Sequence, residues 1–233
     1  MGQRLQPLVT GEIYHVYNRG AHKADIFYND SDRERFLALL LVANCNQPVH
    51  LENLLKKYRG STFIRLFEEE VPKLGERLVD VLAYCLMPNH FHLVVRQLVD
   101  GGITSFMRKV ATAHVMAHNA RHEHSGTLYQ GKFKSRHVDS DEYLRWLFSY
   151  VHLNPLDLIE PRWKEGGFRA TRQARLFLEH YRWSSLPDFQ LRKRPERNIL
   201  SGDIRRAADF TDMLRIVRDD NYKGRTFISR VFV

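Results

Sequence analysis

The stretch Met87-Pro88-Asn89-His90-Phe91-His92-Leu93-Val94-Val95 begins as a turn and continues as an apolar, β-branched run. This pattern predicts a tight connection at Pro88-Asn89 and a strand over residues 90–97. Because alternate side chains of a strand share a face, His90 and His92 point to one side of the sheet and Phe91 to the other. Two imidazoles on one rigid face are half of a divalent-metal site. Spacing alone leaves two satisfied core histidines as the alternative.

The segments on either side of this strand predict the fold. Working outward, the hydrophobic periods and breakers predict strands over residues 12–18, 77–87 and 127–138, and helices over residues 31–45, 104–122 and 141–153. The resulting order β-α-β-β-α-β-α is typical of a ferredoxin-like split arrangement followed by one more helix. We therefore expect an α+β fold, with an antiparallel sheet and helices packed on it.

The last predicted helix carries a tyrosine and an amide at helical spacing. Tyr150 and Asn154 are four residues apart and therefore share a face of the helix. Its apolar spacing predicts a buried face made of Leu144, Leu147, Phe148 and Val151. Tyr143, Tyr150 and Asn154 then fall along a neighbouring face. A tyrosine beside a metal site suggests phosphoryl chemistry with a tyrosine nucleophile, although most helical tyrosines are packing residues.

Five phrases of the sequence together resemble one family. His90-Phe91-His92 resembles the histidine–hydrophobic–histidine motif of the HUH endonucleases. The phrase Leu86-Met87-Pro88-Asn89-His90-Phe91-His92, followed by Tyr150…Asn154-Pro155, resembles the single-tyrosine transposases, most closely the REP-associated tyrosine transposases. Supporting phrases in the family's order are Tyr14-His15-Val16-Tyr17-Asn18-Arg19-Gly20, Gly131-Lys132-Phe133-Lys134-Ser135 and Tyr181-Arg182-Trp183-Ser184-Ser185. The resemblance runs from about residue 10 to about residue 190.

This resemblance implies a metal-dependent endonuclease and transposase acting on single-stranded DNA at hairpin-forming repeats. His90, His92 and Asn154 are then the ligands of a divalent cation, magnesium or manganese. Tyr150 is the nucleophile, which forms a 5′-phosphotyrosine and releases a 3′-hydroxyl. Related transposases include both dimers and monomers, so the resemblance leaves a homodimer and a monomer open.

Substitutes for two of these roles remain open. Glu12 and Asp80 are alternatives to Asn154 as the third ligand. Tyr143, one heptad before Tyr150, is the alternative nucleophile.

Composition favours an anionic partner. The 233 residues include 36 Lys and Arg against 27 Asp and Glu, which gives a net charge of +9. Nucleic acid is the commonest anionic partner, although a basic surface also serves solubility. The two cysteines, Cys45 and Cys85, exclude a disulfide framework and a thiolate zinc site. No run has the length of a membrane span and the first residues lack a signal peptide's apolar core, so we expect no membrane partner and a cytoplasmic, nucleoid-associated protein.

Basic side chains are the candidates for DNA contact. Lys132, Lys134 and Arg136 alternate along the predicted fourth strand and so line one of its faces, as a stripe that binds the DNA backbone does. A solvated sheet edge is the alternative interpretation. Further candidates are Arg19, Arg108 and Lys109.

The chain is expected to divide into a core and an extension. Residues 1–160 are the predicted catalytic core, with an irregular insertion over about residues 46–77. Residues 161–233 are the predicted C-terminal extension, packed on the core and a candidate for DNA recognition, with a terminal helix over residues 205–219.

Three other classes of protein compete with the transposase. A non-catalytic nucleic-acid-binding protein on a ferredoxin-like fold would have no use for the histidine pair. A metal-dependent hydrolase would need more Asp or His ligands than Leu93-Val94-Val95 supplies after His92. A plasmid relaxase or replication initiator commonly carries a third histidine in the motif or a pair of tyrosines.

Overall fold

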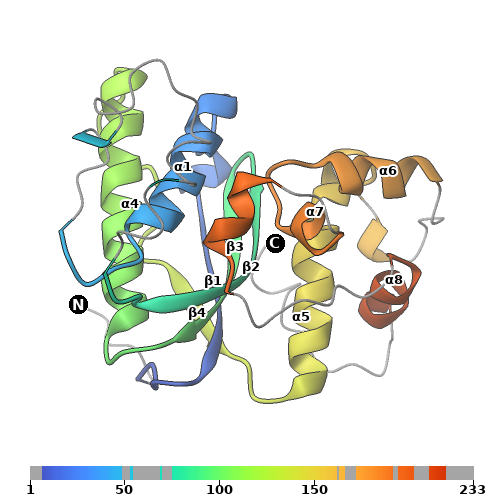
Figure 1. The fold of residues 1–233 in the computed structure, drawn as a ribbon. Helices are drawn as coiled ribbons and strands as arrows, with labels where there is room; N and C mark the ends of the chain where they lie inside the picture. The colour runs from blue at the N-terminus through green and yellow to red at the C-terminus, as the bar shows by residue number, and fades with distance from the viewer. Residues whose placement is uncertain are drawn as a thin grey trace.

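The centre of the molecule is a four-stranded antiparallel sheet with strand order β2-β3-β1-β4 (Figure 1). The strands are β1 (Ile13–Arg19), β2 (Val79–Met87), β3 (His90–Gln97) and β4 (Lys134–His137). Helix α1 (Asp30–Val42) follows β1, and α4 (Gly102–Arg121) lies between β3 and β4. This order and connectivity are those of the split βαββαβ arrangement, so the predicted ferredoxin-like α+β fold is confirmed.

The computed structural model describes residues 7–48, 53–54, 69, 75–161, 163–165, 172–190, 194–201 and 210–218. Most of the predicted insertion over residues 46–77, and the first part of the predicted terminal helix, lie outside these residues. The rest of that helix is α8 (Phe210–Arg218). In the described part, no helix is both long and apolar enough to cross a membrane.

Helices cover both faces of the sheet. Figure 1 shows α1 and α4 together on one side and α5 (Asp141–Leu153) on the other. Phe91 packs against Phe36 of α1, with ring centroids 5.1 Å apart, whereas His92 contacts Tyr150 of α5, with centroids 5.5 Å apart. The alternation of β3 therefore sends Phe91 into one layer and the two histidines into the other.

Side-chain caps fix where α1 and α5 begin. The side chain of Asn29 accepts a hydrogen bond from the Asp32 N–H, and that of Ser140 accepts one from the Tyr143 N–H. Both caps satisfy backbone donors that the first helical turn leaves without a partner. Because Asn and Ser mark both starts in the sequence, these helix beginnings are predicted to within about a residue.

Helix α5 is buried on two sides, so its buried surface is wider than the single face predicted from its spacing. Tyr143, Tyr150 and Asn154, expected along a neighbouring face, are all buried, whereas Leu144 is only partly buried. The sheet covers one side of the helix, and α7 (Leu186–Phe189) and α8 pack on it as well. A helix between two layers buries more than one stripe, so its period alone does not identify every buried position.

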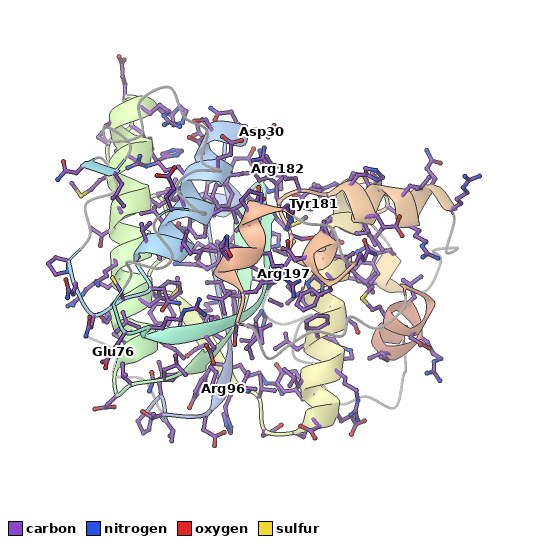
Figure 2. All side chains as sticks on the ribbon, in the orientation of Figure 1. Asp30, Glu76, Arg96, Tyr181, Arg182 and Arg197 are labelled. Atoms are coloured by element: carbon purple, nitrogen blue, oxygen red, sulfur yellow. The ribbon has the colours of Figure 1, made fainter. Side chains whose placement is uncertain are left out.

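The segment after residue 172 lies along the outer edge of β2. The Leu86 N–H donates to the Trp183 carbonyl at 2.8 Å, and the Ser201 N–H donates to the Val81 carbonyl at 2.9 Å. The hydroxyl of Tyr181, which Figure 2 labels, also donates to the Leu86 carbonyl at 2.7 Å. The elements of this segment are α6 (Arg172–His180), α7 and the 3-10 helix η5 (Pro195–Ile199). The described extension therefore packs on the sheet, while the boundary near residue 160 stays a prediction.

The fourth strand is shorter than predicted. It covers Lys134–His137 rather than residues 127–138, and Tyr129 contributes a single bridge to Gly20. Gly126 and Gly131 have φ values of 121° and 154°, which break the extended backbone before the strand begins. The prediction that Lys132 lies in this strand is therefore wrong.

Candidate active site

His90 and His92 lie on the sheet face that α5 covers. In the antiparallel register Arg19 is opposite His90 and Tyr17 is opposite His92, so these β1 side chains share the same face. His92 is completely buried and His90 is partly buried. The predicted histidine pair therefore projects from the central strands of the sheet into the layer of α5.

A third histidine holds His92. His15 Nε2 and His92 Nδ1 are hydrogen-bonded at 2.8 Å, and their rings stack with centroids 5.1 Å apart. His15 was not among the predicted site residues. Alternation along the strand places His15 on the same face as Tyr17 and Arg19. The contact with His92, however, depends on the register between β1 and β3, which are far apart in the sequence.

Tyr150 comes from α5 and meets the histidine pair. Its ring lies edge-on to His92 and stacks on Trp146, with centroids 5.1 Å apart and planes 7° apart. The Lys164 ammonium lies 5.3 Å from the centre of the Tyr150 ring. The phenol is therefore enclosed, and only 2% of the residue is exposed.

Asn154 connects the histidine pair to the tyrosine. It is the C-cap residue of α5, one turn after Tyr150, and its Oδ1 lies 3.4 Å from His90 Nε2. A side-chain hydrogen bond between Asn154 and Tyr150 also lowers the pKa of the phenol. His90 Nδ1 is held by Asn89 Oδ1 at 2.7 Å. The structure thus brings together His90, His92, Tyr150 and Asn154.

The electrostatics of the cluster keep its imidazoles neutral. Burial lowers the pKa of His90 to about 4. The pKa of His92 is lowered chiefly by burial, and further by the nearby His90 and His15. Burial raises the pKa of Tyr150 above its ordinary value near 10, and the hydrogen bond from Asn154 only partly opposes this. At neutral pH the cluster therefore holds two neutral imidazoles and a protonated phenol.

The donor set fits a divalent cation with open coordination positions. Two neutral imidazoles and one amide oxygen are acceptable ligands, and Asn154 Oδ1 lies 3.4 Å from His90 Nε2. The alternative ligands are engaged elsewhere: Glu12 Oε2 binds His137 Nε2 at 2.7 Å, and Asp80 pairs with Arg96 at 3.6 Å. Asn154 is thus the better placed third ligand.

Three of the predicted DNA-binding residues share the histidine face of the sheet. Lys134 is opposite Tyr17, Arg136 is opposite His15, and Arg19 is opposite His90. Their positive charges therefore border the cluster on the β1 and β4 side.

The other predicted DNA-binding residues lie elsewhere. Arg108 and Lys109 belong to α4, on the opposite side of the sheet. The Lys109 ammonium donates to the carbonyls of Cys45 and Gln47 at 2.6 and 2.8 Å, so it joins two segments of the protein. Lys132 is exposed, just before β4.

A protein-family model matches the part of the chain that carries this cluster. The family model described as "Transposase IS200 like" matches residues 46–154, which include the histidine pair, Tyr150 and Asn154. This match confirms a resemblance to the IS200-like transposases over that part of the chain. A solved structure of a REP-associated tyrosine transposase bound to a REP hairpin matches 88% of this chain and 93% of that one, at 11% identity and a TM-score of 0.48. No curated protein matches the sequence.

Proposed function

The chain resembles the IS200-like transposases over residues 46–154, and from this premise we propose that it cleaves and rejoins single-stranded DNA through a phosphotyrosine. The observation that carries the proposal is the contact between His92 and Tyr150, beside the Asn154 amide that reaches His90. A nucleophile side chain next to a set of metal-ligand side chains is the arrangement that phosphoryl transfer to tyrosine needs. The substrate class that the resemblance implies is DNA with hairpin-forming repeats.

The chemistry is a transesterification in which Tyr150 is the attacking group. The phenolic oxygen forms a bond to phosphorus, the bond from phosphorus to the 3′-oxygen breaks, and the phenol's proton ends on the departing 3′-hydroxyl. A 3′-hydroxyl that later attacks the phosphotyrosine reverses these changes and rejoins a strand. His90, His92 and Asn154 would hold a magnesium or manganese ion, which would supply charge stabilisation at the phosphate.

The enclosure of Tyr150 sets a requirement for this reaction. Its ring lies between Trp146 and His92 and is 2% exposed, so a DNA phosphate reaches the phenol only after neighbouring side chains move. The hydrogen bond with Asn154 favours the ionised phenol and orients it toward the ligand set. We therefore propose that substrate binding opens the contact between α5 and the sheet.

Basic side chains on the same sheet face are the proposed path of the DNA backbone. Arg19, Lys134 and Arg136 border the cluster, and each phosphate they neutralise would add roughly 0.7 to the salt dependence of single-strand binding. Arg108 and Lys109 on α4, the exposed Lys132 and the extension after residue 161 are proposed only as secondary contacts.

The test is covalent attachment of DNA to the protein. A hairpin repeat from the source genome, labelled on the 3′ side, is incubated with magnesium or manganese and resolved on denaturing gels. We expect a labelled protein adduct and a released fragment with an extendable 3′-hydroxyl. Tyr150→Phe and His90→Ala should lose both products, whereas the matched Tyr143→Phe should keep them.

Two outcomes would change the assignment. An adduct that persists in Tyr150→Phe and disappears in Tyr143→Phe would move the nucleophile to Tyr143. Retained DNA binding without an adduct, with either metal and several repeats, would indicate the non-catalytic nucleic-acid-binding protein instead.

A further inference from the structure

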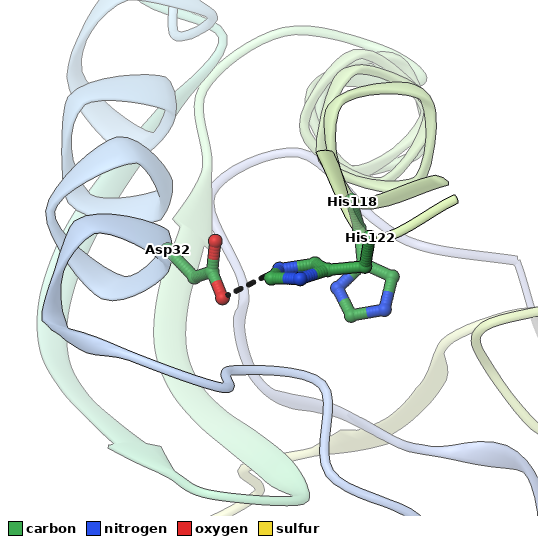
Figure 3. Close-up of side chains that lie close together, drawn as sticks. All are labelled: Asp32, His118 and His122. Atoms are coloured by element: carbon green, nitrogen blue, oxygen red, sulfur yellow. Dashed lines mark hydrogen bonds and ion pairs between the residues drawn. The ribbon is translucent and has the colours of Figure 1, made fainter. Parts of the chain in front are cut away.

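A second cluster of metal-ligating side chains lies on the opposite side of the sheet. Asp32 in the first turn of α1 meets His118 and His122 near the end of α4 (Figure 3). One ligand atom from each residue lies within 4.8 Å of those of the other two. This cluster belongs to the layer of α1 and α4, whereas the proposed nucleophile lies on α5.

His118 is the unusual member of the cluster. It is only 2% exposed, and both of its ring nitrogens are buried without a hydrogen-bond partner in the described part of the chain. Buried polar atoms nearly always have a hydrogen-bond partner, because an unpaired one loses its hydrogen bonds to water and gains none in the protein. The nearby His114 is different, since its Nε2 is hydrogen-bonded to the Ile26 carbonyl at 2.9 Å. His118 therefore lacks the partner that its burial requires.

Asp32 is held with one oxygen toward the histidines. Arg121 donates to Oδ1 at 2.7 Å, while the Tyr28 N–H donates to Oδ2 at 2.9 Å. His122 Nε2 also lies 3.2 Å from Oδ2, as the dashed line in Figure 3 marks. Arg121 therefore holds Oδ1 in place, and Oδ2 is the oxygen that faces the histidines.

We propose that Asp32, His118 and His122 bind a divalent transition-metal ion of the zinc class. Histidines four residues apart on a helix project from one face, which is the spacing that helical zinc sites use. Nitrogen and carboxylate ligands suit zinc, with a water as the fourth ligand. Bond lengths of about 2.0–2.2 Å require the three side chains to close slightly around the ion.

The protonation states of His118 and Asp32 agree with this role. Burial, and then the neighbouring His122, lowers the pKa of His118, so its imidazole is neutral at pH 7. Burial raises the pKa of Asp32, but hydrogen bonds from Tyr28, His122 and Arg121 outweigh it and the carboxyl stays ionised. A metal ion needs these deprotonated forms.

The ion would be structural and would join α1 to α4. Its ligands come from the start of one helix and the end of the other, and the Tyr28 ring covers both histidines, with centroids 4.7 and 4.5 Å away. A metal that binds the folded chain more tightly than the unfolded chain raises its stability. The site does not depend on DNA cleavage.

Calorimetric titration of the full chain with zinc tests the proposal. The protein should carry His90→Ala and His92→Ala, so that the other histidine cluster is removed. We expect one zinc per chain, an affinity loss of roughly 100-fold or more in an added His118→Gln or His122→Gln, and none in the matched His180→Gln on α6. Visible absorption of the cobalt-substituted protein should show the same dependence on the two histidines.

Two results of the zinc titration would overturn the proposal. Zinc binding that is absent, or that is unchanged in His118→Gln and His122→Gln, would exclude the site. If His118→Gln does not fold, the half-buried His122 carries the test through its own variant. Because this background lacks His90 and His92, the outcome is independent of whether the chain cleaves DNA.

Discussion

At the scale of single residues, the hydrogen bond between His15 and His92 has a chemical consequence. It occupies Nδ1 of His92, so Nε2 is the nitrogen that the proposed function assigns to the cation. A partner of this kind fixes both the tautomer and the ring orientation of a ligand histidine. His15 is therefore a positioning residue in the proposed reaction.

Replacing His15 should weaken the use of the metal. We expect His15→Leu to lower adduct formation by about 10- to 100-fold and to raise the metal concentration needed for half-maximal cleavage. His15→Gln, which keeps a hydrogen-bonding amide, should lose less. The measurement is the rate of cleavage at a series of manganese concentrations. A lower maximal rate with an unchanged half-maximal manganese concentration would contradict the role of His15 in positioning His92.

The candidate site was predictable where its signals were local. The alternation of β3 placed His90 and His92 together, and one helical turn placed Asn154 beside Tyr150. The role of His15 depended on the register of β1 with β3, which no local pattern contains. Lys109, predicted as a DNA contact, also depends on the tertiary structure, because its ammonium donates to two backbone carbonyls of its own chain.

At the scale of elements, α5 links the candidate site to the extension. One side carries Tyr150 toward β3, and another carries Phe148 and His152 against Phe189 of α7. The ring centroids of Phe148 and Phe189 are 4.8 Å apart. Sequence periodicity could not predict α7 or η5, because a four-residue helix and a short 3-10 helix contain too few residues for a period.

Truncating the α7 side of this contact should destabilise the fold. Phe189→Ala removes a buried ring and should reduce the free energy of unfolding by about 3–5 kcal/mol. The matched Leu176→Ala, at an exposed position on α6, should change it by less than about 0.5 kcal/mol. Urea unfolding followed by circular dichroism measures both, and equal small effects would contradict the packing role of α7.

At the scale of the whole molecule, several buried histidines make stability depend on pH. Burial lowers the pKa of His15 to about 3 and those of His90 and His114 to about 4, against about 6.5 in an unfolded chain. Between these values the unfolded chain binds more protons than the folded chain. Stability is therefore full above about pH 6.5 and falls as the pH drops toward 4.

Acid should lower the urea midpoint of the protein well before its carboxylates protonate. Each of these histidines contributes a slope of about 1.4 kcal/mol per pH unit in that window. We expect a lower midpoint at pH 5 than at pH 7, measured with a chelator present, and a weaker pH dependence in His114→Gln. The same midpoint at both pH values would show that these imidazoles are not buried in neutral form.

The pairing of the extension with the β2 edge also bears on the order in which the chain can fold during synthesis. The carbonyl of Val81 and the N–H of Leu86 find their partners at Ser201 and Trp183. A ribosome releases residues 79–87 about a hundred residues before these partners. Until then the edge of the sheet is open to pairing with other chains. Slower synthesis of the segment after residue 87 would therefore lengthen the time for which this edge of the sheet has no partner.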